Sequence, residues 1–422
     1  MQSELTESVQ ASIRPGEMVD LYYAGETNTG KQAYPCVPNT RFVQQFTNLG
    51  AGSSQFVISP QGGVSDIILQ FVTPASTGSN YTNGALSSGW GYALINRVSV
   101  RYGSSAQYFW SGPQMWLESV FEAENNSKVD ALLQLGGNAA VGAAMGGIQA
   151  NVYLKLPHNA CRAQGKPLPF PSDLLVQPIV ITVELYSLTS IITNQAAAAP
   201  FTIGPTALAS AQLQVKQEML TDSSDLLARR VDMNTHAYTF PLRFFAQQET
   251  TVAVTSDAQN SQNSINLTGF RAGEVKHILC WLTTAAQSTP GSGNYQPLNW
   301  AAMTDIQLTY NGEIFNRFDA TSFQLWNAVE DEKTPVVNGL VTQSFGSVAS
   351  TTAPAYYVRL DLSQVNPGYD RESKLVHGKP ILNAVVQLQF RAPAASTAYV
   401  LHAQYLYNAS LLCSRGSAEY VF

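Results

Sequence analysis

The chain has 422 residues, which is enough for two domains that each bury a core of their own. Only 12% of its residues are charged, about half the usual roughly 25%. Its surface therefore suits contacts with copies of itself, where charged groups would have to be desolvated. The net charge is -6 and the basic residues are scattered, which excludes direct nucleic-acid binding through a basic patch.

Residues 1–28 form a polar arm in which Leu5, Val9 and Ile13 are spaced to line one face of a short helix. The arm either docks on a neighbour or a membrane surface, or is a frayed terminus. The first residues are acidic where a secretory signal is basic, and no run reaches 18 apolar residues. We therefore expect neither a signal peptide nor a transmembrane helix.

Four cysteines beside apolar stretches predict buried free thiols: Cys36, Cys161, Cys280 and Cys413.

From Arg41 onward, apolar residues alternate with polar ones between clusters of Gly, Ser and Pro, which predicts a β-rich domain. The loop 74–94 and the segment 118–150 are long, which in a compact domain indicates function or an interface. The polar and charged segment 221–235 predicts a linker to a second domain. The strands predicted in the first domain are 41–47, 54–59, 64–73, 96–102, 153–157, 177–187 and 209–218.

One stretch of the chain occurs twice, as residues 96–117 and again as residues 304–327. Both copies alternate apolar and polar residues, reach a turn at Gly103 or at Asn311-Gly312, become aromatic and close on Gln-x-Trp. Pro113 fits the first turn of a helix, where its missing N–H costs nothing. Each copy therefore predicts a strand, a turn and a short helix.

The repeat extends outward from this stretch, and loops as well as strands correspond. Three pairs of aromatic residues lie 210 positions apart: Phe71 and Trp281, Trp90 and Trp300, Trp116 and Trp326. The matched segments are 64–73 with 274–283, 153–156 with 357–360, and 177–180 with 379–382, the last two at offsets of 204 and 202. Two tandem domains of one fold follow, and chance similarity of two β-rich segments is the alternative.

Many short strands without long helices between them predict an all-β protein built as two tandem eight-stranded jelly rolls, a double jelly roll with short helices and long loops. The predicted organisation is an N-terminal arm (1–28), a first jelly roll (29–220), a linker (221–235) and a second jelly roll (236–422).

No pattern in the sequence is typical of a catalytic, cofactor or metal site. The five histidines form no pair at metal-binding or catalytic spacing. The glycine-rich segment 136–147 lacks the spacing and the preceding strand of a dinucleotide loop, so its small residues indicate the close approach of a neighbouring chain. The acidic run 330–332 is typical of a solvated loop rather than of a cation site between subunits. We expect a protein that is not an enzyme and holds no cofactor or metal.

Several segments resemble the double jelly-roll major capsid proteins of large eukaryotic double-stranded DNA viruses, a lineage that includes adenovirus hexon and tectivirus capsid proteins. The resemblance covers nearly the whole chain. The junction lacks the paired Glu-Arg usual in the family, and the tail has one glycine where relatives often have more, which leaves the virus family open. The segments that carry the resemblance are 306–326, 156–169, 219–230 and 402–422.

The resemblance implies a structural protein of the virion capsid, assembled in the infected host cell. Three copies would form a capsomer of pseudo-hexagonal outline, and capsomers would tile an icosahedral shell. It also implies contacts with neighbouring capsomers, with minor capsid or penton proteins and, through the N-terminal arm, with an internal membrane, but none with nucleic acid. Loops at one end of the rolls would form outward towers, for which the candidates are 74–94, 118–150, 284–302 and 328–355.

Four aromatic residues in or beside these loops are candidates for anchoring the towers or the trimer seam: Tyr81, Trp90, Tyr295 and Trp300. The alternative is that they cap the core of each roll.

Two other functions stay open from the sequence. One is a double jelly-roll scaffold that shapes a membrane during assembly and is absent from the mature particle. The other is a tandem β-sandwich that binds carbohydrate through its aromatic loops.

Overall fold

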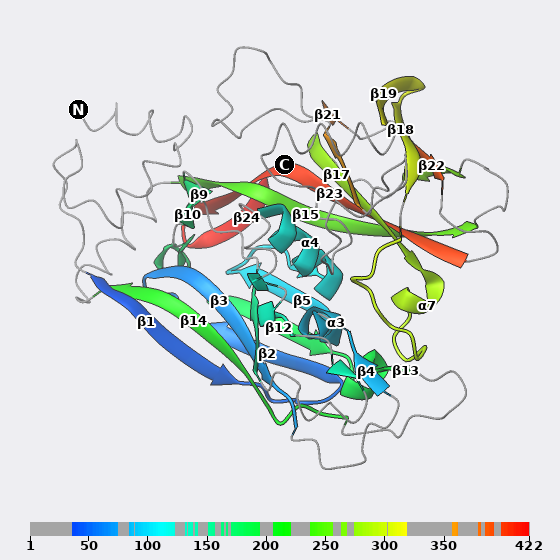
Figure 1. Cartoon of the computed structure of the whole chain (residues 1–422). Coiled ribbons are helices and arrows are strands. Elements are labelled where there is room, and N and C mark those ends of the chain that lie inside the picture. Colours follow the sequence, from blue (N-terminus) through cyan, green and yellow to red (C-terminus); the bar gives the residue numbers. More distant parts are fainter. Residues whose placement is uncertain are drawn as a thin grey trace, which may run out of the picture.

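The computed structural model describes the chain in segments (Figure 1). These are residues 36–74, 84–87, 89–122, 131–132, 134–137, 140–141, 151–156, 162–163, 166–167, 170–194, 206–220, 237–255, 263–267, 274–301, 303–318, 357–361, 379–380, 385–391 and 398–421. The predicted arm and linker lie outside these segments, so the predicted domain boundaries stay a prediction.

The first roll is a sandwich of two antiparallel sheets. One sheet has the order β1-β14-β3-β8, and the other has the order β2-β12-β5-β6. Numbered along the chain, its eight main strands therefore pair as 1-8-3-6 and 2-7-4-5, which is the jelly-roll arrangement. The strands are β1 (Cys36–Gln45), β2 (Gly52–Ile58), β3 (Gly63–Val72), β5 (Ile95–Tyr102), β6 (Tyr108–Trp110), β8 (Asn151–Lys155), β12 (Ile179–Leu185) and β14 (Ser210–Leu220).

The second roll repeats this arrangement strand for strand. Its sheets have the orders β15-β23-β17-β20 and β16-β22-β18-β19, which are again 1-8-3-6 and 2-7-4-5 along the chain. The predicted duplication and the predicted double jelly-roll fold are therefore confirmed. The strands are β15 (Ala237–Thr255), β16 (Asn263–Leu267), β17 (Glu274–Thr284), β18 (Thr304–Tyr310), β19 (Glu313–Phe318), β20 (Tyr357–Asp361), β22 (Val386–Arg391) and β23 (Ala398–Ser414).

Short elements complete the two rolls. In each roll a two-residue strand pairs with the start of the third main strand: β11 (Phe170–Pro171) with β3, and β21 (Lys379–Pro380) with β17. The final strand β24 (Ser417–Val421) extends the second roll by pairing with the end of β23. The others are β4 (Gly84–Leu86), β7 (Ala140–Val141), β9 (Arg162–Ala163), β10 (Lys166–Pro167), β13 (Thr193–Asn194), α3 (Trp90–Leu94), α4 (Gly112–Glu122), α7 (Ala285–Ser288), η2 (Ser172–Leu174) and η3 (Leu188–Ile191).

The core of the first roll forms because alternate residues of each strand turn inward. β3 alternates buried and half-buried residues along Ser65–Val72, as the period of two predicts. Between the sheets Phe46 packs edge-on against Phe56 and Phe71, with ring centroids 4.8 and 5.8 Å away. In the second roll, by contrast, four consecutive residues of β17 are buried, Cys280 to Thr283. This strand is therefore covered on both faces.

The repeated stretch has the predicted structure where the structure describes it. β5 and β18 end at turns in which Gly103, Asn311 and Gly312 all have positive φ. In the first copy the helix is α4, with Pro113 in its first turn. Ser111 and Gln114 cap it reciprocally, each side chain accepting from the other residue's backbone N–H. The second helix falls outside the described residues.

One predicted match in the downstream half of the repeat is wrong. The sequence similarity predicts that 379–382 is the counterpart of 177–180, but Pro380 pairs with Glu274 as Phe170 pairs with Val64. The strand β21 is therefore the counterpart of β11, with Pro380 at the position of Phe170. The counterpart of β12 is β22, in which Val386 lies opposite Tyr310 as Ile179 lies opposite Tyr102. The two aligned segments share only a proline before branched apolar residues, which fits more than one strand start.

The match of β8 with β20 is correct as a pair of strands but differs by one residue in register. Tyr153 lies opposite Gln70, whereas Tyr357 lies opposite Trp281, one position beyond the counterpart of Gln70.

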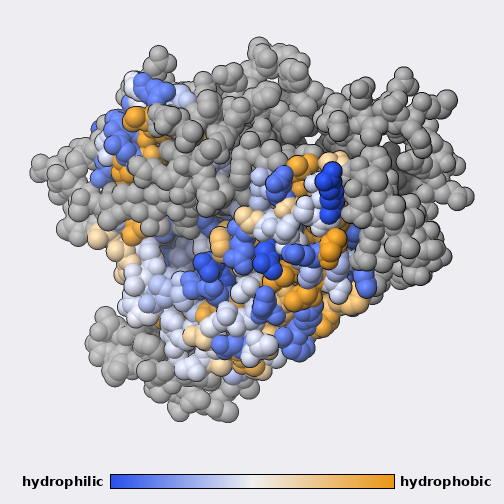
Figure 2. Space-filling model, turned by 180° about the vertical axis from the view of Figure 1, so that it is seen from behind, coloured by the Kyte–Doolittle hydropathy of each residue, from blue (hydrophilic) through white to orange (hydrophobic). Residues whose placement is uncertain are grey.

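The described part of the outer surface carries both polar and apolar residues. Figure 2 shows hydrophilic and hydrophobic residues intermixed over the coloured part of one face.

In the described segments, no helix is long and apolar enough to cross a membrane. Cys280 and Cys413 are buried and are not in a disulfide, as predicted, and the other two cysteines lie where no side chain is described.

Candidate functional site

Three loops far apart in the sequence meet at one end of the first roll and form a small sheet of their own. β4 pairs with β13 on one side and with β7 on the other. β4 belongs to the predicted tower loop 74–94 and β7 to the predicted tower segment 118–150, so the structure brings these two candidates together. The third member, β13, follows β12 and was not predicted. We call the group of β4, β7 and β13 with α3 and η3 the loop cluster.

Backbone hydrogen bonds hold α3 within the loop cluster. The N–H groups of Gly89 and Gly91 donate to the carbonyl oxygens of Gly137 and Gly136, at 2.7 and 2.9 Å. Such a close approach of two backbones requires residues without side chains. A Cβ on Gly136 would lie 2.7 Å from the Tyr92 ring, and a Cβ on Gly137 would lie 2.6 Å from Trp90 Cδ1.

This packing corrects the interpretation of the glycine-rich segment 136–147. Gly136 and Gly137 admit Tyr92 and Trp90 of the same chain rather than a neighbouring chain. Residues 142–147 lie outside the described segments, so the expectation is corrected for the first two glycines alone.

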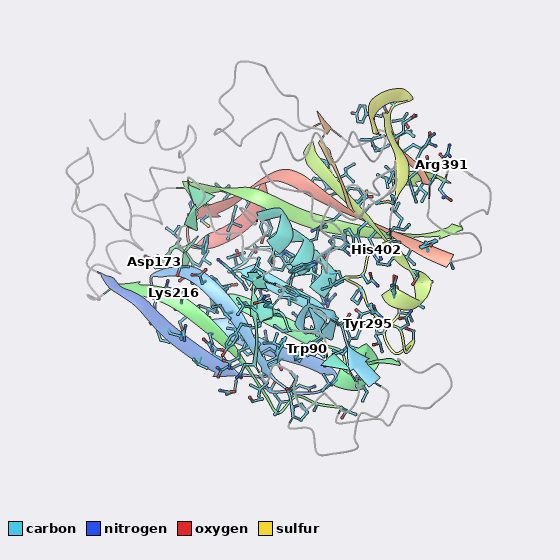
Figure 3. All side chains as sticks on the ribbon, viewed as in Figure 1. Trp90, Asp173, Lys216, Tyr295, Arg391 and His402 are labelled. Carbon is cyan, nitrogen blue, oxygen red and sulfur yellow. The ribbon has the colours of Figure 1, made fainter. Side chains whose placement is uncertain are left out.

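The candidate aromatic residues are mostly buried within the chain. Trp90 lies in α3, Trp300 lies beside Trp281 with ring centroids 6.3 Å apart, and Tyr295 lies in the loop after α7; all three are buried. Figure 3 shows Trp90 and Tyr295 at the same end of the molecule. Tyr81 lies outside the described residues. Burial means that these side chains hold their loops from inside, and a role at a trimer seam stays a prediction.

The two rolls are joined directly at the loop-cluster end. The Tyr295 ring packs edge-on against Tyr186, with centroids 5.9 Å apart, and the Gly291 N–H donates to the Ser190 carbonyl at 2.8 Å. Residues 186–194 thus take part in both the loop cluster and the joint. The sequence contained one sign of this, a short apolar group just past the strand: Leu188, Ile191 and Ile192, which are all buried.

A second joint lies at the opposite end of the rolls, where the turn between β23 and β24 meets the first roll. The Val176 N–H donates to the Gly416 carbonyl at 2.9 Å. The Ser104 hydroxyl donates to the Ala418 carbonyl at 3.3 Å and accepts from the Ala418 N–H at 3.1 Å. One side chain therefore satisfies both backbone groups of a residue on β24. Two joints at opposite ends hold the rolls as one unit.

Replacing Ser104 by alanine removes both hydrogen bonds of this joint. We expect the free energy of unfolding to fall by about 1 kcal/mol, the net value of such bonds in water. Denaturant titration measures the change, and the matched control is Ser53→Ala at the exposed start of β2. Equal stability of the two variants would contradict a role for Ser104 in joining the rolls.

His402 is the histidine whose side chain the structure describes, and its contacts support the fold. The His402 ring stacks on Trp281, with centroids 5.0 Å apart and planes 7° apart. His402 Nε2 lies 2.9 Å from Thr283 Oγ1, which in turn bonds to the Ser288 hydroxyl. These contacts tie β23 and β17 to α7, whose own start has a capping box formed by Thr284 and Gln287. They therefore anchor the loop that carries Tyr295.

Among the described residues, no three His, Cys, Asp or Glu side chains converge as they would around a metal ion. Two buried groups have pKa values above their usual range, the Cys280 thiol and the Tyr92 phenol. Burial raises the pKa of the Cys280 thiol to about 12, and burial also raises the pKa of Tyr92 to about 12 although a hydrogen bond with Ser119 opposes the shift. A thiol held in this protonated form is a poor nucleophile.

Alkaline conditions should therefore destabilise the protein. Both pKa values are raised on folding, from 9.0 for the thiol and 10.0 for the phenol, so the stability that these groups contribute is complete below pH 9 and is lost as the pH rises toward 12. Each group lowers the free energy of unfolding by about 1.4 kcal/mol per pH unit within its window. Denaturant titrations from pH 7 to 12 measure this loss. A stability that stays flat above pH 9 would contradict it.

Two jelly rolls of one strand order, joined at both ends, define a double jelly roll. No protein-family model and no curated protein matches the sequence. Among solved structures the chain is similar to VP54 of PBCV-1, with 15% identity over 94% of this chain and 100% of that one, and a TM-score of 0.60. It is also similar to a chain of the Sputnik virophage solved by cryo-EM, with 11% identity over 97% and 92% of the two chains and a TM-score of 0.55. The chain thus has the double jelly-roll fold of viral capsid proteins.

Proposed function

We propose that the protein is a major capsid protein that forms trimeric capsomers and tiles an icosahedral virus shell. The observation that carries the proposal is the repeat of one jelly roll, strand for strand, over the length of the chain. The similarity to VP54 over all of that chain supports it, as does the similarity to a quasi-atomic model of the PBCV-1 virus capsid at a TM-score of 0.59. Two rolls fixed by two joints make a rigid unit, and three such units supply the six lobes of a pseudo-hexagon.

The proposed role is structural rather than catalytic, and the protein is located in the virion capsid. Its partners are other copies of itself, first within the trimer and then in neighbouring capsomers, together with minor capsid or penton proteins. The N-terminal arm contacts an internal membrane in this proposal. Support for self-assembly comes from the low fraction of charged residues, because the surface is buried at little electrostatic cost.

The loop cluster is the proposed tower on the outer side of the capsomer. Trp90 anchors the loops of the loop cluster from within, Trp300 anchors the adjoining loop of the second roll against Trp281, and Tyr295 fastens that loop to the first roll. Their burial and the contact between Tyr295 and Tyr186 support these roles. Tyr81 belongs to the same proposed tower by its place in the sequence.

Electron microscopy of the purified chain tests the proposal. The expected particle has six lobes in a pseudo-hexagonal outline. A scaffold of the same fold would give the same particle, so quantitative mass spectrometry of mature virions is the second arm. An abundant shell component supports the capsid role, and a protein confined to immature particles identifies the scaffold. Single two-lobed molecules that bind a glycan array would instead identify a carbohydrate-binding sandwich and overturn the proposal.

A further inference from the structure

The strand β24 belongs to the second roll, but the turn before it and its first residues contact the first roll. Gly416 and Ala418 are buried, whereas the residues on either side of Ala418 are exposed. The Gly416 carbonyl accepts from the Val176 N–H, and both backbone groups of Ala418 are bound to the Ser104 hydroxyl. Figure 1 shows β24 on the side of the second roll that faces the first. We call Gly416 and Ala418, with their partners Val176 and Ser104, the clasp.

Gly416 suits the clasp because it has no side chain. Its φ of +76° lies in the left-handed region, as the tight turn between β23 and β24 requires. A Cβ on Gly416 would also meet Val176, at 3.2 Å from the Val176 Cβ and closer still to its Cγ2. This one position therefore serves both the turn and the contact between the rolls.

The corresponding turn of the second roll is closed by its own roll. In the turn between β18 and β19, the Asn311 N–H donates to the Val385 carbonyl and the Asn311 side-chain oxygen accepts from the Val385 N–H, both at 2.9 Å. Val385 directly precedes β22, as Pro178 directly precedes the counterpart strand β12. Proline has no N–H to donate, so the same pair of bonds cannot form in the first roll. There the turn between β5 and β6 binds β24 instead, through Ser104.

The clasp joins residues that are far apart in the sequence. Ser104 and Ala418 are 314 positions apart, and β24 follows the main strands of both rolls. The entropic cost of closing a loop rises with the length of the loop. Folding of the two rolls shortens the free chain between Ser104 and Ala418 and so lowers this cost. We therefore expect the clasp to close after both rolls have folded.

Closure of the clasp fixes the orientation of one roll relative to the other. At the loop-cluster end the rolls meet through the rings of Tyr186 and Tyr295 and the bond from Gly291 to Ser190. One joint of this size leaves the rolls free to turn about it, and a second joint at the opposite end removes that freedom. Identical units close into a ring only when one contact repeats with a fixed rotation, which requires units of fixed shape.

We infer that the clasp is a latch that closes after both rolls have folded and that makes the chain able to assemble. The link to assembly rests on the proposed function. The latch itself does not, because it concerns the two rolls of a single chain.

Gly416→Ala tests the clasp, because the new methyl group pushes β24 away from Val176. The matched control is Gly312→Ala in the corresponding turn of the second roll, where φ is +84° and nothing among the described residues lies within 4 Å of a Cβ. Both variants therefore carry a similar backbone strain, but only one disturbs the joint. In calorimetry the native chain and the control should unfold in one transition, and Gly416→Ala should unfold in two, one for each roll.

The same two variants measure the effect on assembly. Light scattering over a dilution series should show that Gly416→Ala raises the dissociation constant of the assembly at least tenfold, whereas the control changes it less than twofold. Ser104→Ala is a milder variant that removes both bonds to Ala418 without added bulk, and it guards against misfolding of Gly416→Ala. It should raise the dissociation constant about fivefold, the equivalent of about 1 kcal/mol, with Ser53→Ala as its control.

Pulse-labelling hydrogen exchange of the native chain tests the order of events without any variant. After dilution from denaturant, the amides of β12 and β23 should become protected first, because they lie within the rolls. The amides of Val176 and Ala418 should become protected severalfold more slowly, because both donate across the clasp.

The outcomes separate this inference from the proposed function. Protection of Val176 and Ala418 together with the strands overturns late closure. Variants of Gly416 and Ser104 that unfold and assemble like their controls overturn the clasp as a latch. A native chain that stays monomeric at high concentration overturns the proposed function and the link to assembly, and calorimetry and exchange still decide whether the clasp joins the rolls.

Discussion

Replacing Gly112 by alanine is expected to destabilise the first roll by about 3 kcal/mol or more, because the new methyl group has no space. A Cβ at this position would lie 2.9 Å from the Ile95 carbonyl oxygen and closer still to that of Tyr92. Both obstacles are backbone atoms, at α3 and at the start of β5, so no side chain can rotate away. Relief requires α4 to move from its place against these elements, and denaturant titration measures the cost.

The matched control is Gly291→Ala. Nothing lies within 4 Å of a Cβ at Gly291, whose φ of +80° is the only source of strain. We expect it to cost about 1 kcal/mol, the penalty of the left-handed region for a residue with a side chain. If Gly112→Ala costs no more than the control, then α4 does not approach the backbone as closely as described.

The second large effect is expected at Trp116, which closes the repeated stretch. Its side chain is fully buried and contacts the Tyr92 ring, with centroids 5.3 Å apart. Trp116→Ala should lower the free energy of unfolding by about 3–5 kcal/mol, through lost burial and the cavity left behind. Phe109→Ala on the neighbouring β6 is the control, because its ring is partly exposed and should cost about 1 kcal/mol.

The same experiment tests the duplication in a part of the chain that the structure does not describe. Trp326 holds the position of Trp116 in the second copy. The repeat predicts that Trp326→Ala destabilises the second roll as strongly as Trp116→Ala destabilises the first. A loss below 1 kcal/mol at Trp326 would contradict the equivalence of the two positions.

The strands and the duplication could be predicted because both depend on the order of apolar, polar and aromatic side chains along the chain. Val98, Val100 and Tyr102 alternate with polar residues in the sequence and are all buried, as the period of two predicts. The turn at Asn311-Gly312 could be predicted because its backbone conformation favours those residues. The register of β20 and the counterpart of β12 could not be predicted, because short apolar segments fit several positions equally well. Only the pairing of β20 with β17 and of β22 with β18 selects one position.

The joints between the rolls were not predicted, although a short apolar group, Leu188, Ile191 and Ile192, lies beside one of them. The joints depend on backbone groups such as the Val176 N–H and the Gly416 carbonyl. Nearly every residue carries such groups, so the sequence does not mark the ones that form a joint. The roles of Gly136 and Gly137 were missed for a related reason. A glycine shows that something approaches closely, but the sequence does not say whether it is another chain or, as here, Trp90 and Tyr92.

The central claim is that this double jelly roll is a unit of a trimeric capsomer, and the native mass of the purified chain tests it most directly. Size-exclusion chromatography with light scattering should give a mass three times the 45.7 kDa of one chain, and that mass should persist on dilution. A mass of one chain at high concentration, with both rolls folded, would contradict the capsomer.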